Sequence, residues 1–160
     1  NNFGNLCQRV TAFAIKNCEA TIPKIIEFNQ NDLKILNKFK TNLNLIRDKI
    51  DKQDINFYID FIVNSLFDAN KYFNDEEPWK KKDDISRLNT IVYTSLEIIR
   101  KICYMLYPII PESSLKALKI FSIEEKKIEF SSIENHNYLI GGDKIKKIDI
   151  LFKKIEKNHD

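Results

Sequence analysis

The sequence predicts an all-α fold, a helical bundle with a short C-terminal extension. Its 160 residues include only three glycines and four prolines. So few turn-forming residues favour long helices joined by few connections. Apolar residues recur at three- and four-residue spacing over most of the chain, which is typical of helices with one buried face. A chain of this length suits one domain and buries roughly 70% of the surface that its unfolded state exposes.

A first helix is expected from Asn2 to about Asn17. On a helical wheel of ~100° per residue its apolar residues cluster on one side, and these are Phe3, Leu6, Val10, Phe13 and Ala14. Asn5, Arg9 and Lys16 fall within about 40° of one another on the opposite side. One polar stripe therefore follows this helix, either as a solvated face or as a contact surface.

Four more helices are expected from the same periodicity. Asn31 and Asp32 offer a cap for a second helix that reaches about Lys52. The segment from Ile55 to about Tyr72 is apolar on nearly all sides in its first turns, which predicts a central helix covered by its neighbours. The last two helices are expected over Asp84 to Tyr107, where Pro108 stops the helix, and over Glu112 to Phe121.

The C-terminal part of the chain has a different pattern. Residues 122–143 are irregular, and the pair Gly141-Gly142 predicts a turn. The lysine-rich tail 144–156 has the pattern of a turn or two of amphipathic helix. We therefore divide the chain into a helical bundle, residues 1–121, and an extension, residues 122–160, that packs on the same domain.

Charge is segregated along the chain, although the net charge of +3 is too small to indicate a nucleic-acid partner by itself. Residues 31–53 contain six Lys and Arg against three Asp, and residues 143–157 contain six Lys against three acids. The intervening residues 54–77 contain six acids and one Lys. Two basic segments thus flank an acidic one.

The sequence contains no recognisable motif for catalysis, metal binding or membrane insertion. It has no Gly-x-Ser-x-Gly elbow, no Gly-x-x-x-x-Gly-Lys loop and no cluster of metal-ligating residues at ligand spacing. Cys7, Cys18 and Cys103 lie in apolar surroundings, which predicts reduced core thiols in a cytosolic protein. The longest apolar stretch, residues 102–111, is much shorter than the ~20 residues that span a bilayer. These features predict binding without catalysis, with no metal and no membrane contact.

The only tryptophan, Trp79, follows Pro78 at an expected helix break and precedes Lys80, Lys81 and Lys82. An indole offers a flat apolar face on which an unpaired base stacks, and neighbouring lysines neutralise phosphates. This arrangement favours binding of single-stranded nucleic acid. The same position also suits a half-buried packing residue, because tryptophan is highly buried on average.

Four motifs resemble the anticodon-binding domain of methionyl-tRNA synthetases, in the same order along the chain. Asn2-Phe3-Gly4-Asn5-Leu6-Cys7-Gln8-Arg9-Val10 is similar to the (Asp/Asn)-Leu-Gly-Asn-Leu-x-x-Arg-Val start of that domain, and residues 70–79 to its Asn-x-Tyr-x-x-x-x-x-Pro-Trp motif. Residues 108–113 resemble its Pro-x-x-Pro-x-(Ser/Thr) element, and Leu151-Phe152-Lys153-Lys154-Ile155-Glu156 its Leu-Phe-Pro-(Arg/Lys)-Ile-Glu ending. The resemblance covers almost the whole chain.

The resemblance implies roles for five residues. Trp79 would stack on the first anticodon base, a cytosine, and Pro78 would fix the loop that carries it. Asn5 and Lys16 would contact the base edge or a phosphate, and Arg9 would either join them or pair with the acidic segment before Pro78. Lys16 departs from the family, which usually has arginine there, and a lysine ammonium does not reproduce the bidentate contacts of a guanidinium.

The resemblance also implies two partners, namely methionine tRNA with its CAU anticodon and the catalytic domain of the same protein, which uses methionine and ATP. The motifs of that catalytic domain do not occur in this sequence, and the chain begins Asn1-Asn2-Phe3 without an initiator methionine. We therefore expect a non-catalytic segment of a longer protein that needs no cofactor of its own and works as a cytoplasmic monomer. Two alternatives remain open. One is the equivalent domain of another class I synthetase, and the other is a helical protein–protein interaction module anchored by Trp79 and Tyr72.

Overall fold

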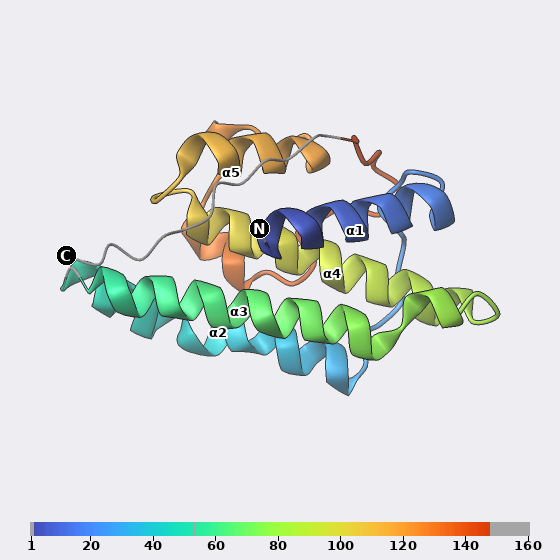
Figure 1. Cartoon of the computed structure of the whole chain (residues 1–160), viewed down its shortest axis with the longest axis horizontal. Coiled ribbons are helices and arrows are strands. Elements are labelled where there is room, and N and C mark those ends of the chain that lie inside the picture. Colours follow the sequence, from blue (N-terminus) through green and yellow to red (C-terminus); the bar gives the residue numbers. More distant parts are fainter. Residues whose placement is uncertain (1, 53, 148–160) are drawn as a thin grey trace.

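The computed structural model describes residues 2–52 and 54–147 of the chain. Five α-helices form this part, as the sequence predicted (Figure 1): α1 (Asn2–Asn17), α2 (Gln30–Asp51), α3 (Ile55–Glu76), α4 (Ile85–Leu106) and α5 (Pro111–Leu118). Short 3-10 turns extend or connect them: η1 (Pro78–Lys80), η2 (Lys119–Phe121), η3 (Glu125–Lys127) and η4 (Phe130–Glu134). The only β contact in the described residues is an isolated bridge between Thr21 and Lys144. The all-α prediction is confirmed.

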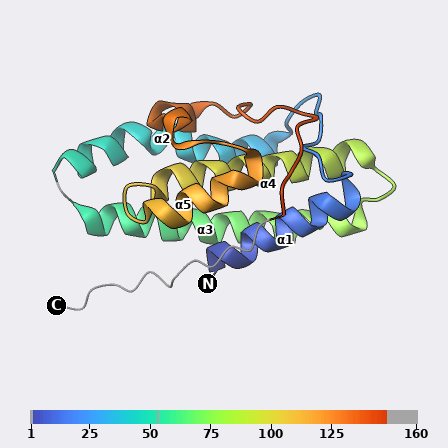
Figure 2. The same ribbon diagram turned by 90° about the horizontal axis from the view of Figure 1, so that it is seen from above.

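The central helix of the bundle is α4. Figures 1 and 2 show it enclosed by α1, α2, α3 and α5, and it contacts all four. Every residue from Thr90 to Leu106 is buried. The prediction that the helix starting at Ile55 is central was wrong, because Val63 and Phe67 of α3 are 49% and 69% exposed. An all-round apolar pattern indicates burial only if neighbouring elements cover every face, and α3 lies at the edge of the bundle.

The second helix begins at Gln30, before the predicted cap at Asn31 and Asp32, and its cap is Asn29. The Asn29 side chain accepts a hydrogen bond from the Asp32 amide at 2.9 Å, and the Asp32 carboxylate accepts one from the Asn29 amide at 2.9 Å. This reciprocal pair satisfies amides of the first turn of α2 that have no partner within the helix. Asp32 therefore lies inside the helix, where it is fully buried.

Three charged residues of α4 bind the described part of the C-terminal extension. The apolar pattern of this helix did not predict them. Glu97, Arg100 and Lys101 are fully buried. Arg100 bonds Glu97 at 2.9 Å and donates to the carbonyl of Asn135 at 2.8 Å, and Lys101 donates to the same carbonyl at 2.9 Å. Each buried charge is thus paired or hydrogen-bonded, which is the condition for burying it at an acceptable cost.

The last described part of the extension forms the isolated bridge with the segment after α1. The Ile22 amide donates to the Asp143 carbonyl at 2.7 Å, and the Gly142 amide donates to the Ile22 carbonyl at 2.7 Å. Gly142 has a φ of 97°, so the predicted turn at this glycine pair is confirmed. Residues 144–147 form no helix, and the Leu151–Glu156 motif lies outside the described residues.

Candidate nucleic-acid interface

The corner between α3 and α4 carries the tryptophan. Helix α3 ends at Glu76, and Glu77 adopts a left-handed conformation with φ 46° and ψ 60° before the 3-10 turn η1. Such a conformation costs free energy in a residue other than glycine and persists only where the surroundings hold it. Helix α4 then starts after Asp84, whose side chain accepts a hydrogen bond from the Arg87 amide at 3.2 Å. Trp79 therefore lies on a short, capped turn.

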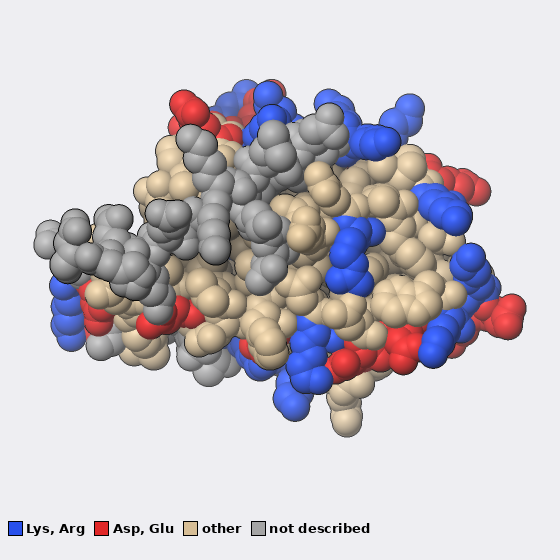
Figure 3. Space-filling model, in the orientation of Figure 1, with Lys and Arg blue, Asp and Glu red and all other residues tan. Residues whose placement is uncertain are grey.

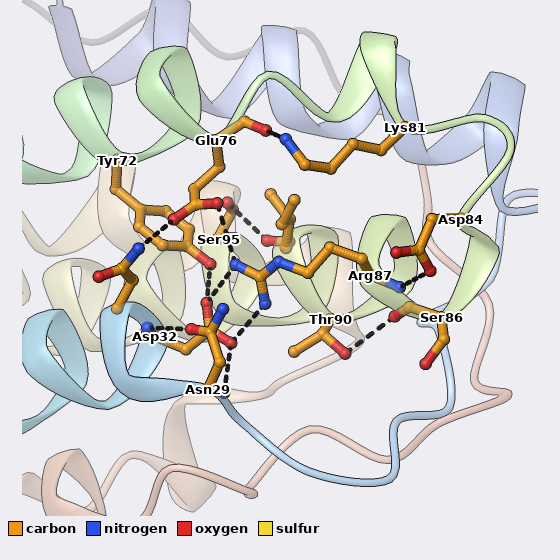
Figure 4. Close-up of polar contacts among 12 residues, drawn as sticks. Asn29, Asp32, Tyr72, Glu76, Lys81, Asp84, Ser86, Arg87, Thr90 and Ser95 are labelled. Atoms are coloured by element: carbon orange, nitrogen blue, oxygen red, sulfur yellow. Dashed lines mark hydrogen bonds and ion pairs between the residues drawn. The ribbon is translucent and has the colours of Figure 1, made fainter.

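A buried polar cluster holds this corner in place, as Figure 4 shows. Arg87 of α4 donates to both oxygens of Asp32, at 2.8 and 2.9 Å, and to Glu76 of α3 at 3.0 Å. Tyr72 of α3 donates its hydroxyl to Asp32. Burial, and then the Asp32 carboxylate, raise the pKa of Tyr72 well above its ordinary value. The cluster ties the start of α2, the end of α3 and the start of α4 together around one buried carboxylate.

Trp79 is anchored on one side and open on the other. Its ring meets the ring of Phe73 edge-on, with centroids 5.8 Å apart and an angle of 68° between the planes. Phe73 is buried and meets Phe13 of α1 edge-on at 6.1 Å. The indole is nevertheless 40% exposed, whereas Pro78 beside it is buried. This combination of a fixed ring and a free face suits a stacking platform.

A hollow of about 360 Å³ lies between Trp79 and the polar side of α1. Its floor includes Phe73, and three cationic side chains line it, Arg9, Lys16 and Lys82. The structure thus brings together three of the residues singled out in the sequence, namely Trp79, Arg9 and Lys16. Figure 3 shows basic side chains interspersed with acidic ones around this end of the molecule, where α1 ends and the chain turns from α3 into α4.

The cations around the hollow are not equivalent. Arg9 donates to the Asn74 side chain at 2.6 Å, and its guanidinium lies 5.3 Å from the centroid of the Phe73 ring. From the sequence, one possibility was that Arg9 pairs with the acidic residues before Pro78. In the structure, Arg9 instead pairs with the side-chain amide of Asn74 in that segment. No ion pair holds Lys16 or Lys82 within the part of the chain that the structure describes. Both ammonium groups therefore face solvent at the hollow.

The three lysines after Trp79 have two different roles: two bind residues of the turn, and one lines the hollow. Lys80 forms an ion pair with Glu77 at 2.7 Å, and Lys81 donates to the carbonyl of Glu76. Only Lys82 of the three lines the hollow. The sequence showed the run but not this division, because the roles depend on how the 3-10 turn directs each side chain.

Two predicted site residues do not line the hollow: Pro78, which is buried in the turn beside Trp79, and Asn5. Asn5 is exposed on α1, one helical turn before Arg9, on the same face of the helix. It lies at the edge of the surface formed by Trp79, Arg9, Lys16 and Lys82. A ligand that fills the hollow reaches Asn5 only by extending along α1.

Other kinds of site are not found in the described residues. These residues contain no group of three or more metal-ligating side chains, and none of their helices is long and apolar enough to cross a membrane. All three cysteines are buried, and burial raises the pKa of Cys18 to about 11. Tyr72, the second anchor of the interaction-module alternative, is buried and bonded to Asp32, so it is not available to a protein partner.

Relatives of known identity match this chain over most of its length. Residues 22–160 match the family described as the anticodon binding domain of methionyl tRNA ligase. A methionine–tRNA ligase of Brucella suis is 33% identical over 134 residues, which are 83% of this chain and 26% of the relative. One of Rickettsia conorii is 32% identical over 160 residues, which are 98% of this chain and 32% of the relative. The chain thus spans about a third or less of the length of these relatives.

Solved structures agree with the sequence matches. The free Mycobacterium tuberculosis methionyl-tRNA synthetase superposes with a TM-score of 0.88 and 26% identity, covering 98% of this chain and 32% of that one. The same enzyme in complex with methionyl-adenylate gives 0.85 and 27%, covering 94% and 30%. The similarity therefore includes the fold as well as the sequence. The chain belongs to the family of anticodon-binding domains of methionyl-tRNA ligases.

Proposed function

We propose that this chain binds the CAU anticodon of methionine tRNA, with the first anticodon base stacked on the open face of Trp79. The observation that carries the proposal is the hollow in which Trp79 meets Arg9, Lys16 and Lys82. Base stacking on an aromatic ring combined with nearby cations is how proteins hold unpaired nucleotides. The buried Asp32–Arg87 cluster supports the proposal, because it fixes the Trp79 corner before any ligand arrives.

In this proposal, each residue around Trp79 has a different role in binding the anticodon. Pro78 is buried and sets the direction of the turn, while Lys16 and Lys82 provide unpaired ammonium groups for phosphates. Arg9 is held by Asn74 and Phe73, so it presents a fixed edge of its guanidinium to the ligand. Asn5 offers both a donor and an acceptor at the edge of the surface, where it meets a base edge or the sugar.

The rest of the function belongs to the whole protein. The relatives are named methionine–tRNA ligases, and a neighbouring structure holds methionyl-adenylate. We propose that the whole protein joins methionine to its tRNA with ATP on a separate catalytic domain, and that this chain selects the tRNA. We propose further that residues 1–121 and 122–160 form one domain, supported by the bonds of Glu97, Arg100 and Lys101 to the extension, and that the protein is a cytoplasmic monomer.

The experiment that tests this proposal replaces the indole side chain of Trp79. Stacking of one base is worth ~1–3 kcal/mol, so Trp79→Ala should weaken binding of a CAU stem-loop roughly ten- to a hundredfold and remove most of the discrimination at the first anticodon base. Trp79→Phe should recover part of the affinity, because a phenyl ring keeps a smaller stacking face. Titration of the three proteins with CAU stem-loops measures this. Wild-type affinity in Trp79→Ala would refute the proposal.

A further inference from the structure

The side chain that orients the Arg9 guanidinium is a neutral amide. The Nη2 atom of Arg9 donates to Oδ1 of Asn74, in the last turn of α3, at 2.6 Å. Asn74 is exposed and does not line the hollow, whereas Arg9 does. A ligand in the hollow therefore contacts Arg9 directly and is influenced by Asn74 only through Arg9.

The three acidic residues that follow Asn74 are each paired with a cation other than Arg9. The pairs are Asp75 with Lys71 at 2.6 Å, Glu76 with Arg87 at 3.0 Å and Glu77 with Lys80 at 2.7 Å. No carboxylate pairs with Arg9 in the part of the chain that the structure describes. The segment that holds Arg9 therefore does not cancel its positive charge.

Two contacts restrain the guanidinium of Arg9. It lies 5.3 Å from the centroid of the buried Phe73 ring, and the hydrogen bond to Asn74 restrains its rotation over that ring. A guanidinium has five N–H donors, so donors remain for a ligand after the bond to Asn74 is made. A cation that is already oriented loses less side-chain entropy when it binds.

An amide and a carboxylate at position 74 would hold Arg9 in similar geometry, but they would affect an anionic ligand differently. The bond to Asn74 is strengthened by the charge of the donor, although its acceptor carries no net charge. A carboxylate at the same place would repel the phosphates of the ligand and offset the attraction of Arg9. With Asn74, Arg9 is both oriented and fully charged.

We propose that Asn74 is a positioning residue for anticodon binding, which orients the Arg9 guanidinium toward the RNA and leaves its charge available to the RNA. The inference rests on the proposed function, because it takes Arg9 to contact an RNA bound in the hollow. It assigns control of affinity and of salt dependence to an exposed residue outside the hollow. Because Asn74 acts through Arg9, its effect on binding must disappear when Arg9 is removed.

The experiment is a double-mutant cycle, in which the chain and its variants are titrated with a CAU stem-loop. Arg9→Ala should weaken binding roughly ten- to a hundredfold. Asn74→Ala should weaken it roughly three- to tenfold, because the guanidinium loses one hydrogen bond and its fixed orientation. The double variant should bind no more weakly than Arg9→Ala. Additive losses would overturn the inference, since Asn74 would then act independently of Arg9.

Asn74→Asp separates orientation from charge. The carboxylate has nearly the same shape as the amide and still accepts a hydrogen bond from Arg9, but it adds a negative charge beside the guanidinium. At low salt this variant should bind the CAU stem-loop more weakly than Asn74→Ala, and the difference from the wild type should shrink at high salt, because salt screens exposed charges. Wild-type affinity of Asn74→Asp at low salt would overturn the inference.

Asn64 provides matched controls, because it is an exposed asparagine of the same helix that does not line the hollow. Asn64→Ala and Asn64→Asp should bind like the wild type. If Asn64→Asp weakened binding as much as Asn74→Asp, the effect would be one of net charge and the inference would be overturned. All variants should unfold near the wild-type temperature, because Arg9 and both asparagines are exposed.

A stem-loop with the first anticodon base changed distinguishes failure of this inference from failure of the proposed function. Lack of preference for CAU in the wild type would overturn the proposed function and the inference with it. Additive losses in the double variant, with the preference of the wild type intact, would overturn the inference alone.

Discussion

At the scale of single residues, the side chains of the candidate site differ in how firmly other residues hold them in place. Trp79 and Arg9 are held by Phe73, the first by an edge-on ring contact and the second by its guanidinium over the ring. Lys16 and Lys82 extend from the rim of the hollow without an ion pair in the described residues. The sequence predicted Trp79, Arg9 and Lys16 as site residues, because residue type and helical spacing can be read from the sequence itself. It did not identify Lys82 separately from its neighbours, because that distinction arises from the geometry of the turn.

The role of Lys16 is tested by its removal. Lys16→Ala should weaken binding of methionine tRNA by ~1–3 kcal/mol, because one phosphate or base contact is lost. The melting temperature should barely change, since the side chain is exposed and has no ion pair within the described ranges. Binding titrations and thermal unfolding of the same protein check this. A large fall in melting temperature would show that Lys16 is structural.

At the scale of helices, some bounds were predictable and the partners were not. Helix α3 ends at Glu76, four residues after the predicted end at Tyr72. Caps, prolines and apolar spacing are local signals, so α1 and α4 begin and end within a residue of the expected positions. Their neighbours are set by contacts between distant segments. The exposed Val63 and Phe67 show this for α3, and the buried Glu97, Arg100 and Lys101 show it for α4. The polar cluster around Asp32 escaped prediction for the same reason, because Asp32 and Arg87 are 55 positions apart.

The cluster around Asp32 makes a strong prediction for stability. Arg87→Met leaves the fully buried Asp32 carboxylate without its charge partner, so we expect a loss of roughly 3–5 kcal/mol in the free energy of unfolding. The matched control is Lys71→Met, which breaks an exposed ion pair with Asp75 on the surface of α3 and should change stability very little. Chemical denaturation of both variants gives the comparison. Equal losses would contradict the structural role of the cluster.

His136 of the C-terminal extension, which contacts Asn37 of α2 and lies near Lys101 and Arg100 of α4, predicts a dependence of stability on pH. Burial, followed by the charges of Lys101, Lys40 and Arg100, lowers the pKa of His136 from 6.5 to about 4. Its Nε2 lies 3.1 Å from the Asn37 side-chain oxygen, and its buried Nδ1 has no partner in the described residues, so a second proton would be unpaired. The unfolded state therefore binds more protons between these pKa values, and stability is lost as pH falls from about 6.5 towards 4.

Urea denaturation at pH 6.5 and pH 5 checks this dependence. The wild type should lose more stability over this interval than His136→Gln, which has no imidazole to titrate. Lys101, whose pKa burial lowers from 10.5 to about 7, is present in both proteins, so its own contribution affects both measurements alike. An equal loss in both proteins would exclude His136 as the titrating group.

At the scale of the whole molecule, one buried helix organises both the extension and the proposed site. Helix α4 fixes the Trp79 corner through Arg87 at its start. Further along, Arg100 and Lys101 hydrogen-bond the extension. Figures 1 and 2 show α1 crossing the same helix, so that its polar face meets the corner between α3 and α4. The motifs in the sequence predicted the family and the fold. The convergence of α1 with that corner could only be seen once the chain was folded.

The most direct test of the account is a titration of the wild-type chain with two anticodon stem-loops, one carrying CAU and one with the first anticodon base changed, each at two salt concentrations. We predict tighter binding of the CAU loop at both concentrations and a similar decrease of both affinities with salt, because the salt dependence counts phosphate contacts and not bases. Equal affinity for the two loops would contradict the proposal that Trp79 and its hollow read the anticodon.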